Sequence, residues 1–259
     1  MRYFILLTLL FSLKTHAAAP SFSNINSSDF EKLNKEFATN FLHTTVSPAS
    51  SSSIFGVEVG LIGGVTDTPN IDKFSKEVDP SADITAIPHG FVFATVAIPM
   101  GMSFDLGLLP ETELGSIDIK HFALAAKWNF FSLAVLDLAA KAHYSSSTVA
   151  FKQTVSNIKS DISIEQKSIG VDLIASGNFI FAEPYIGLGF VSTSSTIDSA
   201  ASASIFDNTF TTGSSAKDDY SSAKILAGVQ FNLFLVHIGL EYMNVYSTSR
   251  FSGKLSFYF

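Results

Sequence analysis

The sequence contains no cysteine. We therefore expect no lipoprotein anchor, no disulfide framework and no cysteine-based metal site. Charged residues are also scarce, at 15% of the 259 residues, and the mean hydropathy is +0.32. Such a chain has more apolar surface than a single soluble core usually hides, which points towards contact with lipid.

Long hydrophobic runs are absent as well. After Ala17 no uninterrupted apolar run approaches the roughly eighteen residues of a membrane helix. The first 17 residues have the features of a secretory signal peptide: the positive Arg2, an apolar stretch from Tyr3 to Leu13, and small residues at Thr15 and Ala17. We predict a signal peptide over residues 1–17. Its removal would change the net charge from −7 to −9, so we expect no nucleic-acid partner.

Residues 18–52 form a predicted N-terminal periplasmic segment with one short helix. Ser28 and Glu31 fit a capping box at its start. Apolar residues then recur at helical spacing: Phe30, Leu33, Phe37 and Phe41. The pattern predicts an amphipathic helix over about 29–42. It could pack on the domain that follows or plug the mouth of that domain.

From residue 53 to residue 259 the pattern has a period of two, which is typical of half-buried strands. Residues 102–108 illustrate it, with Met102, Phe104, Leu106 and Leu108 on one face and Ser103, Asp105 and Gly107 on the other. Short and long connections alternate between the segments. The predicted strands are 53–65, 87–98, 102–109, 117–129, 133–145, 161–176, 182–193, 221–231, 234–246 and 250–259.

These strands predict an all-β fold, a closed antiparallel up-and-down transmembrane β-barrel of about ten strands with one short N-terminal helix. Eight or twelve strands remain possible. Most of the strands have close to the roughly 9–11 residues that a tilted membrane strand needs. Strand 87–98 is apolar on both faces, so its orientation is open, and strand 117–129 changes phase between Ile119 and Phe122, which predicts a bulge.

The chain ends in FSGKLSFYF, with apolar Phe251, Leu255, Phe257 and Phe259 on one face. In this ending, and in its strand pattern, the chain resembles the transmembrane β-barrel proteins of the bacterial outer membrane. The resemblance implies that these four residues are the barrel-assembly signal. It also implies an outer-membrane location with both termini periplasmic, and as partners outer-membrane lipid, lipopolysaccharide, the barrel-assembly machinery and periplasmic chaperones.

The polar face of the strands should line the lumen. Its candidates carry both signs of charge: Glu58, Asp105, His121, Lys127, Asp137, Lys141, His143, Asp172, Glu183, Lys224, His237 and Glu241. They could brace the wall through salt bridges or line a narrow polar path. Aromatic residues near the strand ends should mark the two rims: Trp128, Phe130, Phe131, Phe179, Phe181, Phe231 and Phe234 at the short turns, and Tyr144, Tyr242 and Tyr246 at the outer rim.

Two functions therefore stay open. One is a narrow pore for ions or small polar solutes. The other is a non-conducting structural or surface-interaction barrel that acts through its long acidic loops at 66–86 and 193–220. We expect no enzyme, because only His143-Tyr144-Ser145 is similar to a catalytic pattern, the His-x-Ser pair of lipid A deacylases. We also expect no cofactor and no metal.

Overall fold

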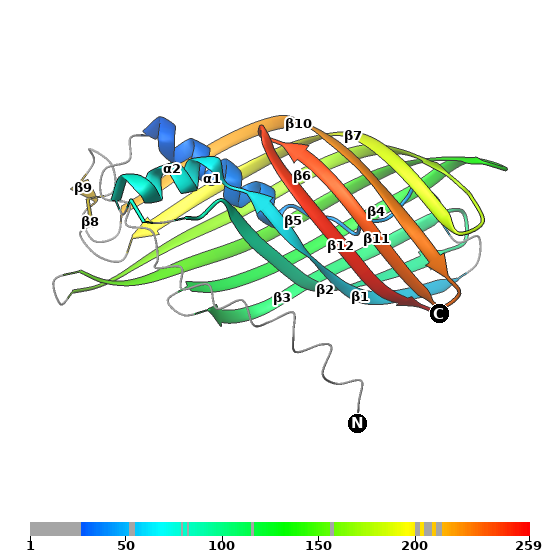
Figure 1. Ribbon diagram of the computed structural model, residues 1–259, viewed down its shortest axis with the longest axis horizontal. Helices are drawn as coiled ribbons and strands as arrows, with labels where there is room; N and C mark the ends of the chain where they lie inside the picture. Colours follow the sequence, from blue (N-terminus) through cyan, green and yellow to red (C-terminus); the bar gives the residue numbers. More distant parts are fainter. Residues whose placement is uncertain are drawn as a thin grey trace, which may run out of the picture.

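The protein is a closed ten-stranded antiparallel β-barrel, described by a computed structural model (Figure 1). The strands neighbour one another in the order β1-β12-β11-β10-β7-β6-β5-β4-β3-β2. The structure describes residues 27–51, 55–78, 80–81, 83–114, 117–155, 158–199, 203–204, 209–210 and 214–259. This confirms the predicted fold class and the strand number of ten.

The elements are the helices α1 (Ser27–Phe41) and α2 (Pro69–Val78), and the strands β1 (Gly56–Asp67), β2 (Ala86–Ile98), β3 (Met102–Leu114), β4 (Ile117–Leu133), β5 (Leu136–Val155), β6 (Ile158–Gly177), β7 (Ala182–Ser199), β10 (Ser214–Leu233), β11 (Val236–Val245) and β12 (Thr248–Tyr258). A separate two-stranded sheet joins β8 (Ala203–Ser204) to β9 (Thr209–Phe210).

The terminal strand closes the barrel. Strand β12 pairs with β1 along its length, and the backbone of Phe259 exchanges two hydrogen bonds with Val57 at 2.8 and 2.9 Å. No strand edge is therefore left at the end of the chain. The four apolar residues of this ending, Phe251, Leu255, Phe257 and Phe259, are all exposed on the outer surface.

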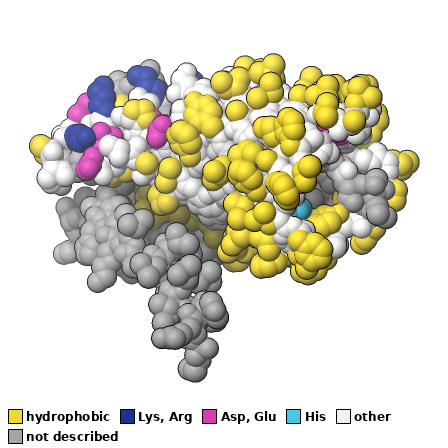
Figure 2. Space-filling model, turned by 45° about the vertical axis from the view of Figure 1, so that its right-hand side comes forward, with side chains coloured by type: hydrophobic (Ala, Val, Ile, Leu, Met, Phe, Trp, Pro, Cys, Tyr) yellow, Lys and Arg dark blue, Asp and Glu magenta, His cyan; other side chains and the backbone are white. Residues whose placement is uncertain are grey.

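Alternation of residue types explains the wall. Along β12, Ser252, Lys254 and Ser256 are buried inside, while Phe251 and Leu255 are exposed outside. Figure 2 shows hydrophobic side chains covering the visible barrel wall, with charged side chains gathered at the end that carries α2. Neither described helix is long and apolar enough to cross a membrane.

We call the two ends of the barrel the short-turn end and the long-strand end. The first carries the turns at 99–101, 134–135 and 234–235 and the C-terminus. The second carries α2 and the start of α1 (Figure 1). Strands β5, β6, β7 and β10 have 18–20 residues, whereas β1, β11 and β12 have 10–12. One side of the wall therefore extends further at the long-strand end.

Several local predictions were wrong. The connection expected between the predicted strands 133–145 and 161–176 is instead a long hairpin, because β5 continues to Val155 and β6 begins at Ile158. The predicted loop 66–86 contains the second helix, α2. Its sequence carried the signal: Pro69 at the first position, Asp72 in the first turn, and Lys76 one turn later.

The predicted bulge in β4 between Ile119 and Phe122 is also wrong. The register shift at that level lies in β3, between Leu109 and Thr112. A second shift lies in β4, between Asn129 and Phe131. Strand β2, whose facing was open, points Phe91 and Phe93 inward.

The aromatic residues predicted at the two rims differ in their exposure. All seven at the short-turn end are exposed: Trp128, Phe130, Phe131, Phe179, Phe181, Phe231 and Phe234. Tyr246 is buried instead, with its ring 5.0 Å from that of Tyr220 and its hydroxyl 2.9 Å from that of Thr193. Its positive φ of 55°, in the turn after β11, directs it inward.

The predicted signal peptide at 1–17, and residues 18–26 of the predicted N-terminal segment, lie outside the described residues. Both stay predictions. The start of α1 lies at the long-strand end, and the C-terminus lies at the short-turn end (Figure 1). The periplasmic placement of the two termini stays a prediction too.

Candidate functional site

Residues 31–51, which we call the lumen segment, occupy the inside of the barrel. From Leu33 to Ala49 almost every residue is buried. Along the segment, successive residues contact the wall at levels that run from the long-strand end to the short-turn end. The carbonyl of Asn34 accepts from Tyr220 near the long-strand end, Thr44 donates to Glu241 at 2.6 Å, and the amide of Ala49 donates to Ser176 at 3.2 Å near the short-turn end. Of the two arrangements open for the predicted helix, the structure has it inside the barrel mouth.

A buried ion cluster centres on Asp172 of β6. Its carboxylate lies 2.6 Å from the ammonium of Lys224 and 3.8 Å from that of Lys141. His143 Nε2 lies 3.5 Å from the same carboxylate. Gly189, on the neighbouring strand, leaves room for this carboxylate, since an added Cβ would stand 2.1 Å from Asp172 Oδ1. Four sequence-predicted lumen residues therefore meet in one place.

The lumen segment reaches this cluster through His43. Its ring stacks on that of His143 with 5.8 Å between centroids, and its Nε2 lies 3.7 Å from the carboxylate of Asp105. Asp105 accepts a hydrogen bond from Thr95 at 2.8 Å within the wall. The wall and the segment thus share one polar interior.

A second ion cluster lies near the short-turn end. Glu58 on β1 lies 3.0 Å from Lys254 Nζ and 3.4 Å from His237 Nδ1, and it accepts from Ser256. These contacts join β1, β11 and β12, the three strands where the barrel closes. The cluster braces the seam between the first and last strands.

The end of the lumen segment is bound by further wall residues. Lys127 donates to the carbonyls of Pro48 and Ser50 at 2.7 and 2.9 Å. Ser50 donates to the carboxylate of Glu183. Because these partners replace water on buried charges, they fix the extended part of the segment in the lumen.

Arg250 of β12 holds the C-terminal end of α1. Its Nη1 donates to the carbonyls of Leu42 at 2.7 Å and Thr39 at 3.0 Å, with Asn40 at 3.4 Å. A helix ends with carbonyls that have no partner within the helix, and a cation there complements the helix dipole. Arg250 thus satisfies the carbonyls at the point where the chain leaves the helix.

The mouth around α1 is apolar. Inward-facing Val149, Phe151, Ile164 and Ile197 of the long strands pack against both helices, with Leu33, Phe37 and Phe41 of α1 and Ile71 and Phe74 of α2. Glu36 joins the helices, because its carboxylate accepts from the amides of Asn70 and Ile71 at 2.8 and 3.0 Å at the start of α2. Burial raises the pKa of Glu36, against the lowering effect of these two amides.

The structure places the predicted lumen residues on the inner surface. His237 is half-buried and the other eleven are buried. Beyond the clusters above, Glu241 accepts from Tyr185, His121 lies 2.9 Å from Ser147 Oγ, and Asp137 accepts from Asn129. The prediction omitted the inward Arg250, Lys254 and His89. The polar parity of β12 would have given the first two, and His89 lies on the strand of ambiguous facing.

The single catalytic pattern is not assembled into a distinct site. His143 Nε2 lies 3.0 Å from Lys224 Nζ and also contacts Asp172. Ser145 is buried in the wall two residues further along the same strand. Among the described residues, no group of three or more His, Cys, Asp or Glu side chains could hold a metal ion.

Several solved structures are similar to this chain at low sequence identity. The translocator domain of the autotransporter NalP from Neisseria meningitidis has a TM-score of 0.50 and 9% identity, over 90% of this chain and 94% of that one. The attachment invasion locus protein Ail of Yersinia pestis has a TM-score of 0.35 and 13% identity, over 79% and 97%. The outer membrane protease OmpT of Escherichia coli has a TM-score of 0.43 and 8% identity, over 83% and 100%.

The likeness to the NalP translocator domain, at a TM-score of 0.50, agrees at the level of the fold with the resemblance to bacterial outer-membrane β-barrel proteins. No curated protein matches the sequence. A family model matches residues 21–257, most of the chain, and its description reads "Family of unknown function (DUF6588)". The chain belongs to that family.

Proposed function

We propose that this chain is an outer-membrane β-barrel that forms a narrow channel for ions or small polar solutes, and that the lumen segment keeps it closed. The observation that carries the proposal is the chemistry of the strands that surround residues 42–51 of the lumen segment. These strands carry charged and hydroxyl groups on their inner surface, so the lumen would hold water if the segment left it. As described, the segment fills the space through which a solute would pass.

The outer surface supports the membrane location. Exposed aliphatic and aromatic side chains cover β1, β3, β6, β7 and β12, and exposed aromatics gather near the short turns. Lipid accepts such a surface, whereas water does not. The short-turn end with Phe259 would face the periplasm, and the start of α1 would then lie at the outer end rather than in the periplasm.

Conductance of the refolded chain in a planar bilayer tests the proposal. We expect rare openings from the native chain and frequent openings from Arg250→Ala, because this variant removes the donor to the last carbonyls of α1. A variant in which a disulfide locks the lumen segment to the barrel wall provides the control. Val46 Cγ1 lies 2.7 Å from the position of a Cβ on Gly239, so the V46C/G239C pair can form a disulfide between segment and wall.

In the locked Arg250→Ala background we expect silence when the disulfide is formed and openings again after reduction. The channel is rejected if folded Arg250→Ala stays silent although its lumen segment has become accessible to a thiol reagent. Such silence would favour the second function, a surface-interaction barrel. The specific observation behind that alternative is the extension of β5, β6, β7 and β10 beyond the other strands.

A further inference from the structure

The barrel wall is split between β2 and β3 at the long-strand end. Their pairing begins at Ile98 opposite Met102 and stops at Val92 opposite Leu108. Beyond that point β2 continues to Ala86 and pairs only with β1, while β3 continues to Leu114 and pairs only with β4. Residues 86–91 and 109–114 therefore have no strand pairing with each other, and β2 and β3 diverge at this end (Figure 1).

Proline explains the split. Pro110 of β3 and Pro88 of β2 have no amide hydrogen to donate, and β3 shifts register at Pro110. The split begins within the apolar band of the outer surface, on the side of the long-strand end, since Leu108 and Val92 beside it are exposed apolar residues. Unpaired backbone at membrane depth is tolerated where protein covers it or where it lines a cavity.

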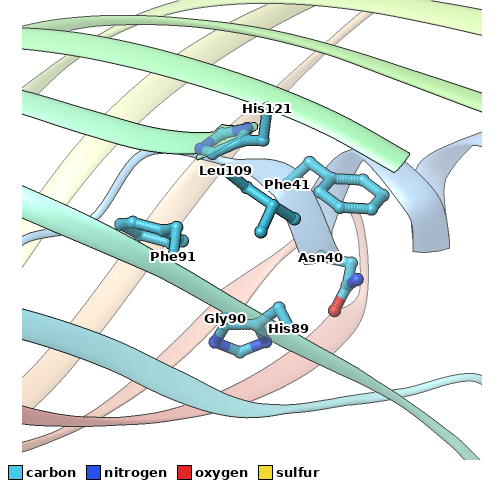
Figure 3. Close-up of a pocket in the computed structure, with 7 residues that line it drawn as sticks. All are labelled: Asn40, Phe41, His89, Gly90, Phe91, Leu109 and His121. Atoms are coloured by element: carbon cyan, nitrogen blue, oxygen red, sulfur yellow. The ribbon is translucent and has the colours of Figure 1, made fainter. Parts of the chain in front are cut away.

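The lumen segment covers the split from inside. Asn40 donates to the carbonyl of Pro88 on β2 at 3.3 Å and accepts from Thr66 on β1 at 2.7 Å, so it binds the β2 side of the split. A hollow remains behind the split, lined by Asn40, Phe41, His89, Gly90, Phe91, Leu109 and His121. Figure 3 shows Leu109 among the rings of Phe41, Phe91 and His121.

The hollow is apolar with two unused polar atoms. His121 lies 5.1 Å from Phe91 and 6.1 Å from Phe41 between ring centroids. His89 Nδ1 and His121 Nε2 are buried without a hydrogen-bond partner among the described atoms, while their other nitrogens contact Ser252 and Ser147. Imidazole nitrogens of this kind suit a ligand with a small polar head.

The charge around the hollow selects the sign of that head. None of the lining residues is acidic. The positive charge of Arg250 acts on both imidazoles, and its buried Nε and Nη2 have no hydrogen-bond partner within the described part of the chain. A carboxylate complements this environment better than a neutral or cationic group does.

We propose that the hollow binds the carboxylate end of a long-chain fatty acid, which enters from the lipid through the split between β2 and β3. The hollow has no room for a water molecule as it stands. Binding of the head group therefore requires the Phe41 ring, which lines the hollow, to move aside, while the alkyl tail remains in the lipid beside Leu108. This proposal rests on the proposed membrane location and is independent of conductance.

A photoreactive fatty acid tests it. The full chain is placed in phosphatidylcholine vesicles with a fatty acid that carries a diazirine near the carboxylate, irradiated, and digested for mass spectrometry. We expect labels on the lining residues from 40 to 41, 89 to 91 and at 109, and at least tenfold fewer with the methyl ester of the same probe. Labels on the outer apolar surface show that the barrel is in the bilayer.

Two variants with the same side-chain change give a matched control. Leu109→Trp should block the hollow and remove at least nine-tenths of the lining labels, while Leu188→Trp, on the exposed outer surface of β7, should leave them unchanged. Phe41→Ala should increase them. Labels confined to the outer surface, lining labels insensitive to Leu109→Trp, or equal labelling by acid and ester would each overturn the proposal.

Discussion

Replacement of Asp172 by alanine is expected to lower the free energy of unfolding of the barrel by about 3–5 kcal/mol, because removal of one partner leaves buried charges uncompensated. Asp172 lies 2.6 Å from Lys224 and 3.8 Å from Lys141, and all three side chains are buried. Without the carboxylate, two ammonium groups would face each other in the lumen. The effect is measured as the denaturant midpoint at which the folded band disappears from unboiled gels.

The control for this variant is an exposed pair of the same chemistry. Asp219 lies 3.2 Å from Lys217, and both side chains are more than 60% exposed. Asp219→Ala should leave the midpoint almost unchanged, because water and salt screen exposed ion pairs. Equal midpoints for Asp172→Ala and Asp219→Ala would show that the ion cluster does not brace the wall.

Replacement of Phe37 by alanine is expected to loosen the lumen segment without unfolding the barrel. Phe37 is buried on α1, with its ring 6.1 Å from that of Phe151 on β5. Loss of a buried phenyl group costs about 3 kcal/mol or more. That energy corresponds to roughly a hundredfold increase in the population of the displaced segment.

Thiol labelling reports this displacement directly. Thr45→Cys places one thiol at a buried position of the lumen segment, in a chain that has no other cysteine. We expect its labelling rate to rise roughly a hundredfold with Phe37→Ala and to stay constant with Lys32→Ala on the exposed side of α1. A constant rate in both variants would mean that the apolar mouth does not retain the segment.

The wall of the barrel could be predicted from the sequence because one physical rule governs it. A strand with lipid outside and a polar lumen inside alternates strictly, so the parity of each segment gave both its type and its facing. Strand lengths were harder to predict. Residues 145–155 and 193–199 extend beyond the apolar band. There Ser and Thr replace the outward apolar residues, and such a composition is typical of a loop.

The contents of the lumen could be predicted only in part. The helical spacing of Leu33, Phe37 and Phe41 predicted the helix, but not the apolar mouth that receives it, because that mouth forms from residues of α2 and of the strands β5, β6 and β7. Arg250 was not among the predicted lumen residues, because the apolar pattern of its strand, with Phe251 and Leu255 outward, indicates only the outer face. The split at Pro110 depends on register, which no single segment contains.

Residues 31–51 run through the lumen, and formation of the V46C/G239C disulfide is the decisive test of this arrangement. Val46 and Gly239 are far apart in sequence and meet only if the segment is inside the barrel. With oxidant added to intact cells that produce the variant, we predict near-complete cross-linking, read as a reducible mobility shift on denaturing gels. Two free thiols that react with a maleimide in the folded barrel, and do not cross-link, would contradict the account.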